Sequence, residues 1–240
     1  MKKKVFFVSK NNSWSNFLFG KLSTLDNIAL YGFNDEQFPL SIDIVQSDKP
    51  DYIFFFHWSK YISQEIFENY NCISFHTSNL PNGRGGTPIQ NQILDGIIKT
   101  KVNAIKTCQE IDAGDIFCSE EITLQGSLYD IWHIISNVSF LMIKKIINTS
   151  LTSIRQTDLI RMTPIYQTDL TRTLYKRNNN NVIPFDTEKN IEGIYRFIQM
   201  MDAEKYKNSY IDIGNFRLSF SRAGIKNDNI IADVLITKKE

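Results

Sequence analysis

Short apolar runs separated by helix-length segments constrain the fold of this chain most. Val5–Val8 is a continuous apolar run, residues 51–57 are rich in aromatic side chains, and Cys72–Phe75 forms a third run. Strands without polar alternation are typical of sheets that are covered on both faces. The sequence therefore predicts an α/β fold with a doubly wound, mostly parallel sheet.

The remaining segments fill in this pattern. Further strands are expected at 42–45, 102–107 and 116–123, and helices at 16–22, 64–69, 87–96, 128–148 and 190–203, with Ser63 and Ser127 as caps of two of the helices. Runs at 209–213, 216–221 and 230–237, separated by turns, predict a small antiparallel sheet. We expect a main domain at 1–150, a linker at 151–189, and a helix with a small β module at 190–240.

Composition narrows the possible partners. The 240-residue chain is 42% hydrophobic and carries a net charge of +1, which favours a small ligand over a long polyanion. Its cysteines, Cys72, Cys108 and Cys118, lack metal-site spacing, so neither a structural zinc site nor a disulfide framework is expected. The N-terminal apolar run is too short for a signal peptide or membrane span. These features predict a cytoplasmic protein that binds no nucleic acid, membrane or metal.

His76 follows the third apolar run and precedes a loop with three glycines, at 83, 85 and 86, bounded by Pro81 and Pro88. Glycine lets the backbone approach a ligand closely, so this imidazole is a candidate site residue. A hydrogen-bonded structural histidine is an equally good interpretation of the chemistry. His57 ends the preceding strand, where a role as a loop anchor is favoured, and His133 is expected at the surface.

A turn at 110–116 places Asp112 and Asp115 three residues apart. Two carboxylates are too few for a convincing site for a hard metal ion. One carboxylate that orients a nearby imidazole is the simpler interpretation.

The segment His76–Gln90, His-Thr-Ser-Asn-Leu-Pro-Asn-Gly-Arg-Gly-Gly-Thr-Pro-Ile-Gln, followed by Asp-Ala-Gly-Asp-Ile at 112–116, resembles the paired signature of the folate-dependent formyltransferases. The resemblance implies a formyltransferase catalytic domain at 1–150 that moves the formyl group of N10-formyltetrahydrofolate to an amine. It places His76 and Asp112 on either side of the reacting carbon.

The chain departs from that family pattern at one position. The family has asparagine two residues before the histidine, where it helps to hold the oxyanion, and this chain has Ser74. Asn79 from the loop, or Ser74 acting through water, is expected to take that role. The resemblance also implies a folate pocket formed largely by backbone of two segments, with Trp58, Lys60, Tyr61, Ile62, Cys108, Ile111 and Asp112 as its positions.

The acceptor amine follows by elimination among branches of the family. Neutral charge and a short C-terminal tail argue against transfer RNA, whereas length and layout are similar to the sugar N-formyltransferases. The expected substrate is therefore a nucleotide-linked amino sugar such as dTDP-4-amino-4,6-dideoxyglucose, for the O-antigen of lipopolysaccharide, and the expected assembly is a homodimer. Lys10, Asn11, Trp14, Arg84 or the Lys176-Arg177 pair are candidates to contact the nucleotide, although packing within the fold is the more common use of a residue like Trp14.

Three alternatives stay open. A catalytically impaired protein that binds folate or a sugar nucleotide would explain Ser74. A formyltransferase that acts on another amine is the second, and a Schiff-base or metal hydrolase on the same sheet is the third.

Overall fold

The structure of the chain is a computed structural model that describes residues 2–149, 153, 156, 174–175, 181–186, 188 and 190–239. The linker expected at 151–189 lies largely outside these residues, and the Lys176-Arg177 pair lies wholly outside them.

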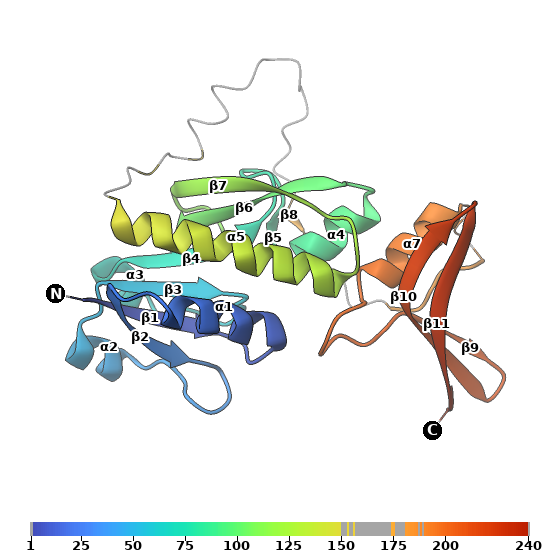
Figure 1. Ribbon diagram of the computed structural model, residues 1–240, viewed down its shortest axis with the longest axis horizontal. Coiled ribbons are helices and arrows are strands. Elements are labelled where there is room, and N and C mark those ends of the chain that lie inside the picture. Colours follow the sequence, from blue (N-terminus) through green and yellow to red (C-terminus); the bar gives the residue numbers. More distant parts are fainter. Residues whose placement is uncertain are drawn as a thin grey trace, which may run out of the picture.

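A six-stranded sheet with the strand order β2-β1-β3-β4-β6-β7 forms the main body (Figure 1). Its strands are β1 (Lys3–Ser9), β2 (Ile28–Phe33), β3 (Tyr52–Phe56), β4 (Cys72–Thr77), β6 (Lys99–Lys106) and β7 (Ile116–Thr123). The pairs among β2, β1, β3 and β4 are parallel, while β4 with β6 and β6 with β7 are antiparallel. The expected doubly wound, mostly parallel sheet is confirmed.

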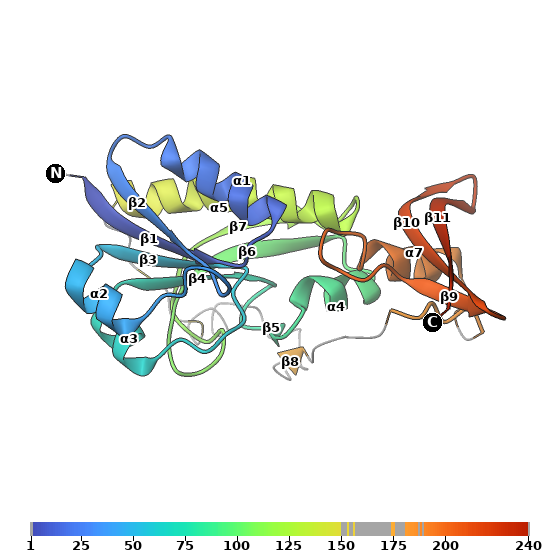
Figure 2. The same cartoon turned by 90° about the horizontal axis from the view of Figure 1, so that it is seen from below.

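Helices cover both faces of this sheet (Figure 2). One face carries α1 (Ser13–Ser23) and α5 (Leu128–Asn148), and the other carries α2 (Ile42–Asp48) and α3 (Gln64–Asn69). Successive side chains of a strand point to opposite faces, so Val5 and Phe7 enter the core under α1 and α5, while Phe6 and Val8 enter the core under α2 and α3. This double burial explains why β1 has no polar alternation.

The sequence analysis misassigned one segment and missed one strand near the edge of the sheet. Residues 42–45, expected as a strand, begin helix α2 instead, because the Ser41 side chain accepts a hydrogen bond from Ile44 N at 3.3 Å and caps the helix. The edge position belongs to β2, which the sequence analysis missed because its side chains are mostly half-buried or exposed. Ser63 occupies the expected cap position of α3 but makes no side-chain capping bond.

A short helix, α4 (Pro88–Leu94), follows the glycine loop, and Arg84–Gly85 (β5) pairs with Leu174–Tyr175 (β8). Beyond α5 lies a C-terminal module of α7 (Ile191–Gln199) and an antiparallel sheet of β9 (Tyr210–Ile213), β10 (Phe216–Lys226) and β11 (Asn229–Lys238). This module sits at one end of the main body, next to α4 (Figure 1). Within the described part of the chain, no helix combines the length and apolarity needed to cross a membrane.

Candidate active site

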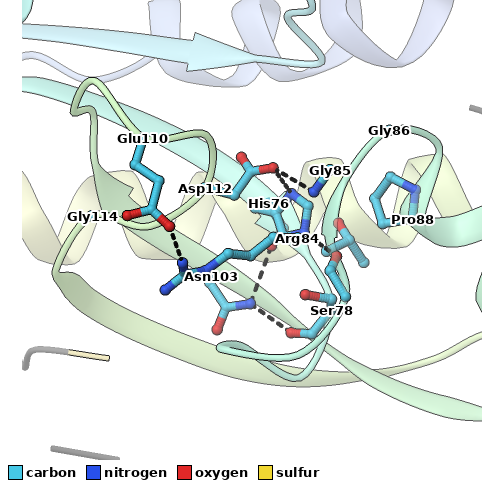
Figure 3. Close-up of polar contacts among 12 residues, drawn as sticks. His76, Ser78, Arg84, Gly85, Gly86, Pro88, Asn103, Glu110, Asp112 and Gly114 are labelled. Atoms are coloured by element: carbon cyan, nitrogen blue, oxygen red, sulfur yellow. Dashed lines mark hydrogen bonds and ion pairs between the residues drawn. The ribbon is translucent and has the colours of Figure 1, made fainter. Parts of the chain in front are cut away.

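His76 and Asp112 meet where β4 and the turn after β6 come together (Figure 3). His76 Nδ1 lies 3.2 Å from Asp112 Oδ2, and the two side chains are 6% and 20% exposed. The same carboxylate oxygen accepts a hydrogen bond from Gly85 N at 3.0 Å. The imidazole, the carboxylate and the glycine loop predicted from the sequence are therefore brought together at one point.

Groups of the protein lie against both ring nitrogens of His76. Nε2 lies 2.8 Å from the carbonyl oxygen of Gly83, which only accepts, so Nε2 carries a hydrogen. Nδ1 lies against the Asp112 carboxylate. Both ring nitrogens are thus engaged by groups of the protein.

The Asp112 turn is held in a tight conformation. Asp112 has a φ of 53°, and Gly114 lies so close to β6 that an added Cβ would be 1.7 Å from the carbonyl oxygen of Lys106. Lys106 N in turn donates to Asp115 O at 2.8 Å. Glycine at 114 is therefore required for the turn to lie against the strand and present Asp112 to the imidazole.

Arg84 and Gln156 brace the same turn. Gln156 donates to the carbonyl oxygens of Asp112 and Gly114 at 2.8 and 3.0 Å, and its Oε1 accepts from Arg84 Nε and Nη2 at 3.0 and 2.6 Å. Arg84 Nη1 also donates to Glu110 at 2.8 Å. The sequence analysis missed Gln156 because it lies in a stretch without periodicity.

Several residues with positive φ angles line the cleft that contains the His76–Asp112 pair. Thr87, directly before α4, has a φ of 47°, and His57 has a φ of 48°. For a β-branched residue such as Thr87 this conformation is a genuine outlier. Both residues and Asp112 line the same cleft, and strain of this kind is typical of functional sites.

Of the two candidates for the asparagine role, Ser74 faces the cleft and Asn79 does not. Ser74 Oγ lies 2.8 Å from Thr107 Oγ1, and both residues line the cleft beside His76. Asn79 is exposed and is not among the residues that line the cleft, because it lies on the turn closed by the hydrogen bond from Asn82 N to Asn79 O. The structure thus separates Asn79 from the position that the sequence analysis gave it.

The cleft has a volume of about 1230 Å³ and contains every predicted folate position: Trp58, Lys60, Tyr61, Ile62, Cys108, Ile111 and Asp112. Tyr61 and Ile111 are 84% and 71% exposed. Trp58 Nε1 is buried and has no hydrogen-bond partner among the described residues. The described residues contain no cluster of three or more His, Cys, Asp or Glu side chains placed to hold a metal ion.

The four candidate nucleotide contacts that lie within the described residues differ in their surroundings. Lys10 and Asn11 line the cleft. Arg84 does not, because its guanidinium is buried against Glu110 and Gln156. Trp14 belongs to the cleft wall, but its side chain is fully buried, so packing within the fold is its observed role.

His57 joins the main body to the C-terminal module, as a loop anchor would. Its ring lies 4.3 Å from that of Trp132, its Nδ1 accepts from Asn12 at 3.0 Å and Trp14 at 3.3 Å, and its Nε2 lies 3.4 Å from the Tyr206 hydroxyl. Burial, and then the charge of Lys10, lower the pKa of His57 to about 3. His57 is therefore neutral at physiological pH, with its hydrogen on Nε2. His133, expected at the surface, is half-buried against Tyr129.

Comparisons with known proteins identify the family. The chain is similar along 98% of its length to a methionyl-tRNA formyltransferase from Clostridium thermocellum, with 33% identity, 99% coverage of that chain and a TM-score of 0.82. This chain belongs to the formyltransferase family. The family model for the C-terminal domain of methionyl-tRNA formyltransferase matches residues 179–237. The predicted enzyme class, a formyltransferase, is confirmed at the level of the family.

Other relatives of this formyltransferase are matched over less of their length or at lower identity. The methionyl-tRNA formyltransferase of Alkaliphilus metalliredigens is 35% identical over 85 residues, and the match spans 35% of this chain and 27% of that relative. HypX from Aquifex aeolicus in complex with tetrahydrofolic acid has a TM-score of 0.70 at 15% identity, over 93% of this chain and 38% of that chain. A 4-N formyltransferase from Francisella tularensis has a TM-score of 0.63 at 18% identity, over 97% of each chain.

These similarities overturn the expected sugar substrate. A sugar 3N-formyl transferase matches with a TM-score of 0.60 at 14% identity, which shows the fold alone. The proteins from C. thermocellum and A. metalliredigens, both above 30% identity, are methionyl-tRNA formyltransferases. The nucleotide-linked amino sugar, the O-antigen role and the absence of a nucleic-acid partner were therefore wrong. The short tail misled the sequence analysis because a module of this size matches the C-terminal domain of methionyl-tRNA formyltransferase. Net charge misled it as well, because an average over the chain hides local charge.

Proposed function

We propose that this formyltransferase moves the formyl group of N10-formyltetrahydrofolate to the amino group of methionyl-tRNA. The observation that carries the proposal is the His76–Asp112 contact in the cleft of a chain that is similar along its length to the enzyme from C. thermocellum. The other open alternatives, an impaired binding protein and a hydrolase, have no comparable support.

The site residues suit the chemistry of this transfer. The amine nitrogen forms a bond to the formyl carbon, the carbonyl oxygen becomes an oxyanion, and the bond from that carbon to N10 then breaks. One proton leaves the attacking nitrogen and one reaches N10, so no other reactant is consumed. We assign the movement of these protons to the His76–Asp112 pair, an imidazole and a carboxylate 3.2 Å apart, because groups of this kind contribute about 10²-fold or more to proton transfer.

The end of the cleft nearest the C-terminal module is suited to a phosphate-bearing acceptor. Lys10, Lys205 and Lys207 line it together with Asn181 and Tyr206. Lys205 also donates to the carbonyl oxygen of Asn11, and Glu204 accepts from Ser13 N at 3.1 Å, so the module is held against the main body here. Local positive charge between the two parts favours a polyanion even though the net charge of the chain is only +1.

The test is a product assay. The protein is incubated with N10-formyltetrahydrofolate and methionine-charged tRNA, the amino acid is released by mild base, and N-formylmethionine is measured by mass spectrometry. We expect the formylated product with charged tRNA, and free methionine should remain a poor acceptor. An absence of product at enzyme concentrations that bind the formyl donor would refute the proposal and favour the impaired binding protein.

Three further expectations remain predictions. They are the boundaries of the catalytic domain at 150 and of the C-terminal module at 190, the homodimer, and the cytoplasmic location. Sedimentation velocity of the purified chain tests the dimer, because a monomer of 27.9 kDa and a dimer sediment at clearly different rates.

A further inference from the structure

The hydrogen bonds of His76 raise the question of which group donates to the oxyanion. With Nδ1 on Asp112 and Nε2 on the Gly83 carbonyl, the imidazole has no free N–H to offer to an oxygen in the cleft. Enzymes that form an oxyanion in acyl transfer aim preorganised donors at it, and such donors account for a large share of the rate. A donor other than His76 is therefore needed on the cleft side of β4.

The Ser74 and Thr107 hydroxyls lie at this place. Ser74 precedes His76 by two residues on β4, so the two side chains project from the same face of the strand. Thr107 follows β6, the antiparallel neighbour of β4, and its backbone N donates to Cys72 O at 2.9 Å. This bond fixes Thr107 beside Ser74, and the two hydroxyl oxygens are 2.8 Å apart.

A pair of hydroxyls at this distance has one hydrogen to spare. One hydroxyl donates to the other, and the hydrogen of the accepting hydroxyl remains available to a third oxygen. Thr107 is buried at 8% exposure, whereas Ser74 is half-buried and opens to the cleft. The arrangement in which Thr107 donates and Ser74 accepts therefore directs the spare hydrogen from Ser74 into the cleft.

We propose that Thr107 is a positioning residue that orients the Ser74 hydroxyl as the hydrogen-bond donor to the oxyanion, so that two hydroxyls do the work of one amide. The inference rests on the proposed function, because it requires an amine to attack a formyl carbonyl in this cleft. As the carbon–nitrogen bond forms, negative charge collects on the former carbonyl oxygen and the bond from Ser74 strengthens. It weakens again when the bond to N10 breaks and the carbonyl is restored.

The first test removes each hydroxyl separately and together. Thr107→Val keeps the shape and loses the hydroxyl, while Thr107→Ser keeps the hydroxyl. We expect kcat for formylation of methionyl-tRNA to fall about 10-fold or more in Thr107→Val and Ser74→Ala, with little change in the KM for the formyl donor, and to stay near the parent value in Thr107→Ser. The double variant Ser74→Ala/Thr107→Val should be no slower than Ser74→Ala, because Thr107 acts through Ser74.

The second test uses the space between the two side chains. Asparagine is longer than serine, and because the two hydroxyl oxygens are 2.8 Å apart, an asparagine side chain in the same direction must displace the Thr107 hydroxyl. Ser74→Asn alone should therefore lose activity about 10-fold or more, as clashing groups at a reacting centre do. Adding Thr107→Ala should restore most of it. This recovery also shows that the loss in the single variant is local, because a misfolded protein would not regain activity.

The outcomes distinguish a failure of the role proposed for Thr107 from a failure of the proposed function. An active parent whose Thr107→Val variant keeps the same kcat, or whose Ser74→Asn/Thr107→Ala variant is no faster than Ser74→Asn, overturns the role of Thr107 and leaves the proposed function standing. An inactive parent overturns both, because there is then no oxyanion for the pair to bind.

Discussion

Gly114→Ala tests how the Asp112 turn positions the carboxylate. The added Cβ would lie 1.7 Å from the Lys106 carbonyl oxygen, whereas contacts under 3.0 Å essentially do not occur, so the turn must move by at least the difference, 1.3 Å. A shift of this size breaks the contact between Asp112 and His76, which is 3.2 Å long. We expect kcat for formyl transfer to fall about 10²-fold, because misplacement by about 1 Å at a reacting centre has that effect.

The same substitution should lower the free energy of unfolding by about 1–3 kcal/mol, as overpacking does. Gly20→Ala is the matched control: Gly20 lies within α1, nothing is within 4 Å of its added Cβ, and alanine there should stabilise the helix by about 0.5–1 kcal/mol with unchanged kcat. Formylation kinetics and thermal unfolding of both variants test the predicted changes in kcat and stability. If Gly114→Ala keeps the kcat and stability of the parent, the reasoning about this turn is refuted.

Two other predictions concern the supports of the site. Arg84→Met should lower the free energy of unfolding by about 1–3 kcal/mol and also reduce kcat, because it leaves the buried Gln156 Oε1 without a donor. Urea unfolding measures the change in stability. The control is Lys99→Met, at an exposed ion pair with Glu121, which should change neither stability nor kcat. The lowered pKa of His57 means that its unfolded form binds a proton below pH 6.5 and its folded form does not, so stability should fall with pH from 6.5 towards 3. The loss in the parent should exceed that in His57→Gln by on the order of 3 kcal/mol between pH 6.5 and 4, and equal slopes would contradict this assignment.

The sheet was predictable because its strands carry local patterns. Val5–Val8 and the aromatic run at 52–56 are buried on both faces, and their apolar pattern predicts strands independently of the neighbouring elements. Ile42, Ile44 and Val45 are also apolar, but the Ser41 cap makes this segment helical. Strand β2 has little apolar pattern, since its place at the edge of the sheet leaves most of it half-buried or exposed, so only its pairing with β1 defines it.

The candidate site was predictable in part for the same reason. His76, Gly114 and Asp112 belong to two short motifs, and the structure brings these motifs together. Thr107 and Gln156 belong to no motif, because their roles depend on which side chain lies opposite them in space. The acceptor proposed here was not predicted from the sequence, because net charge is a property of the whole chain, whereas the lysines that line the cleft act locally.

The rate of methionyl-tRNA formylation by His76→Asn and Asp112→Asn variants tests the central claim most directly. Both substitutions keep the approximate size of the side chain, so folded protein is expected and can be verified by thermal unfolding. We predict that each variant loses about 10²-fold or more in kcat/KM relative to the parent, because the imidazole–carboxylate pair is broken in both. Variants that formylate methionyl-tRNA as fast as the parent would contradict the assignment of this pair as the centre of the reaction.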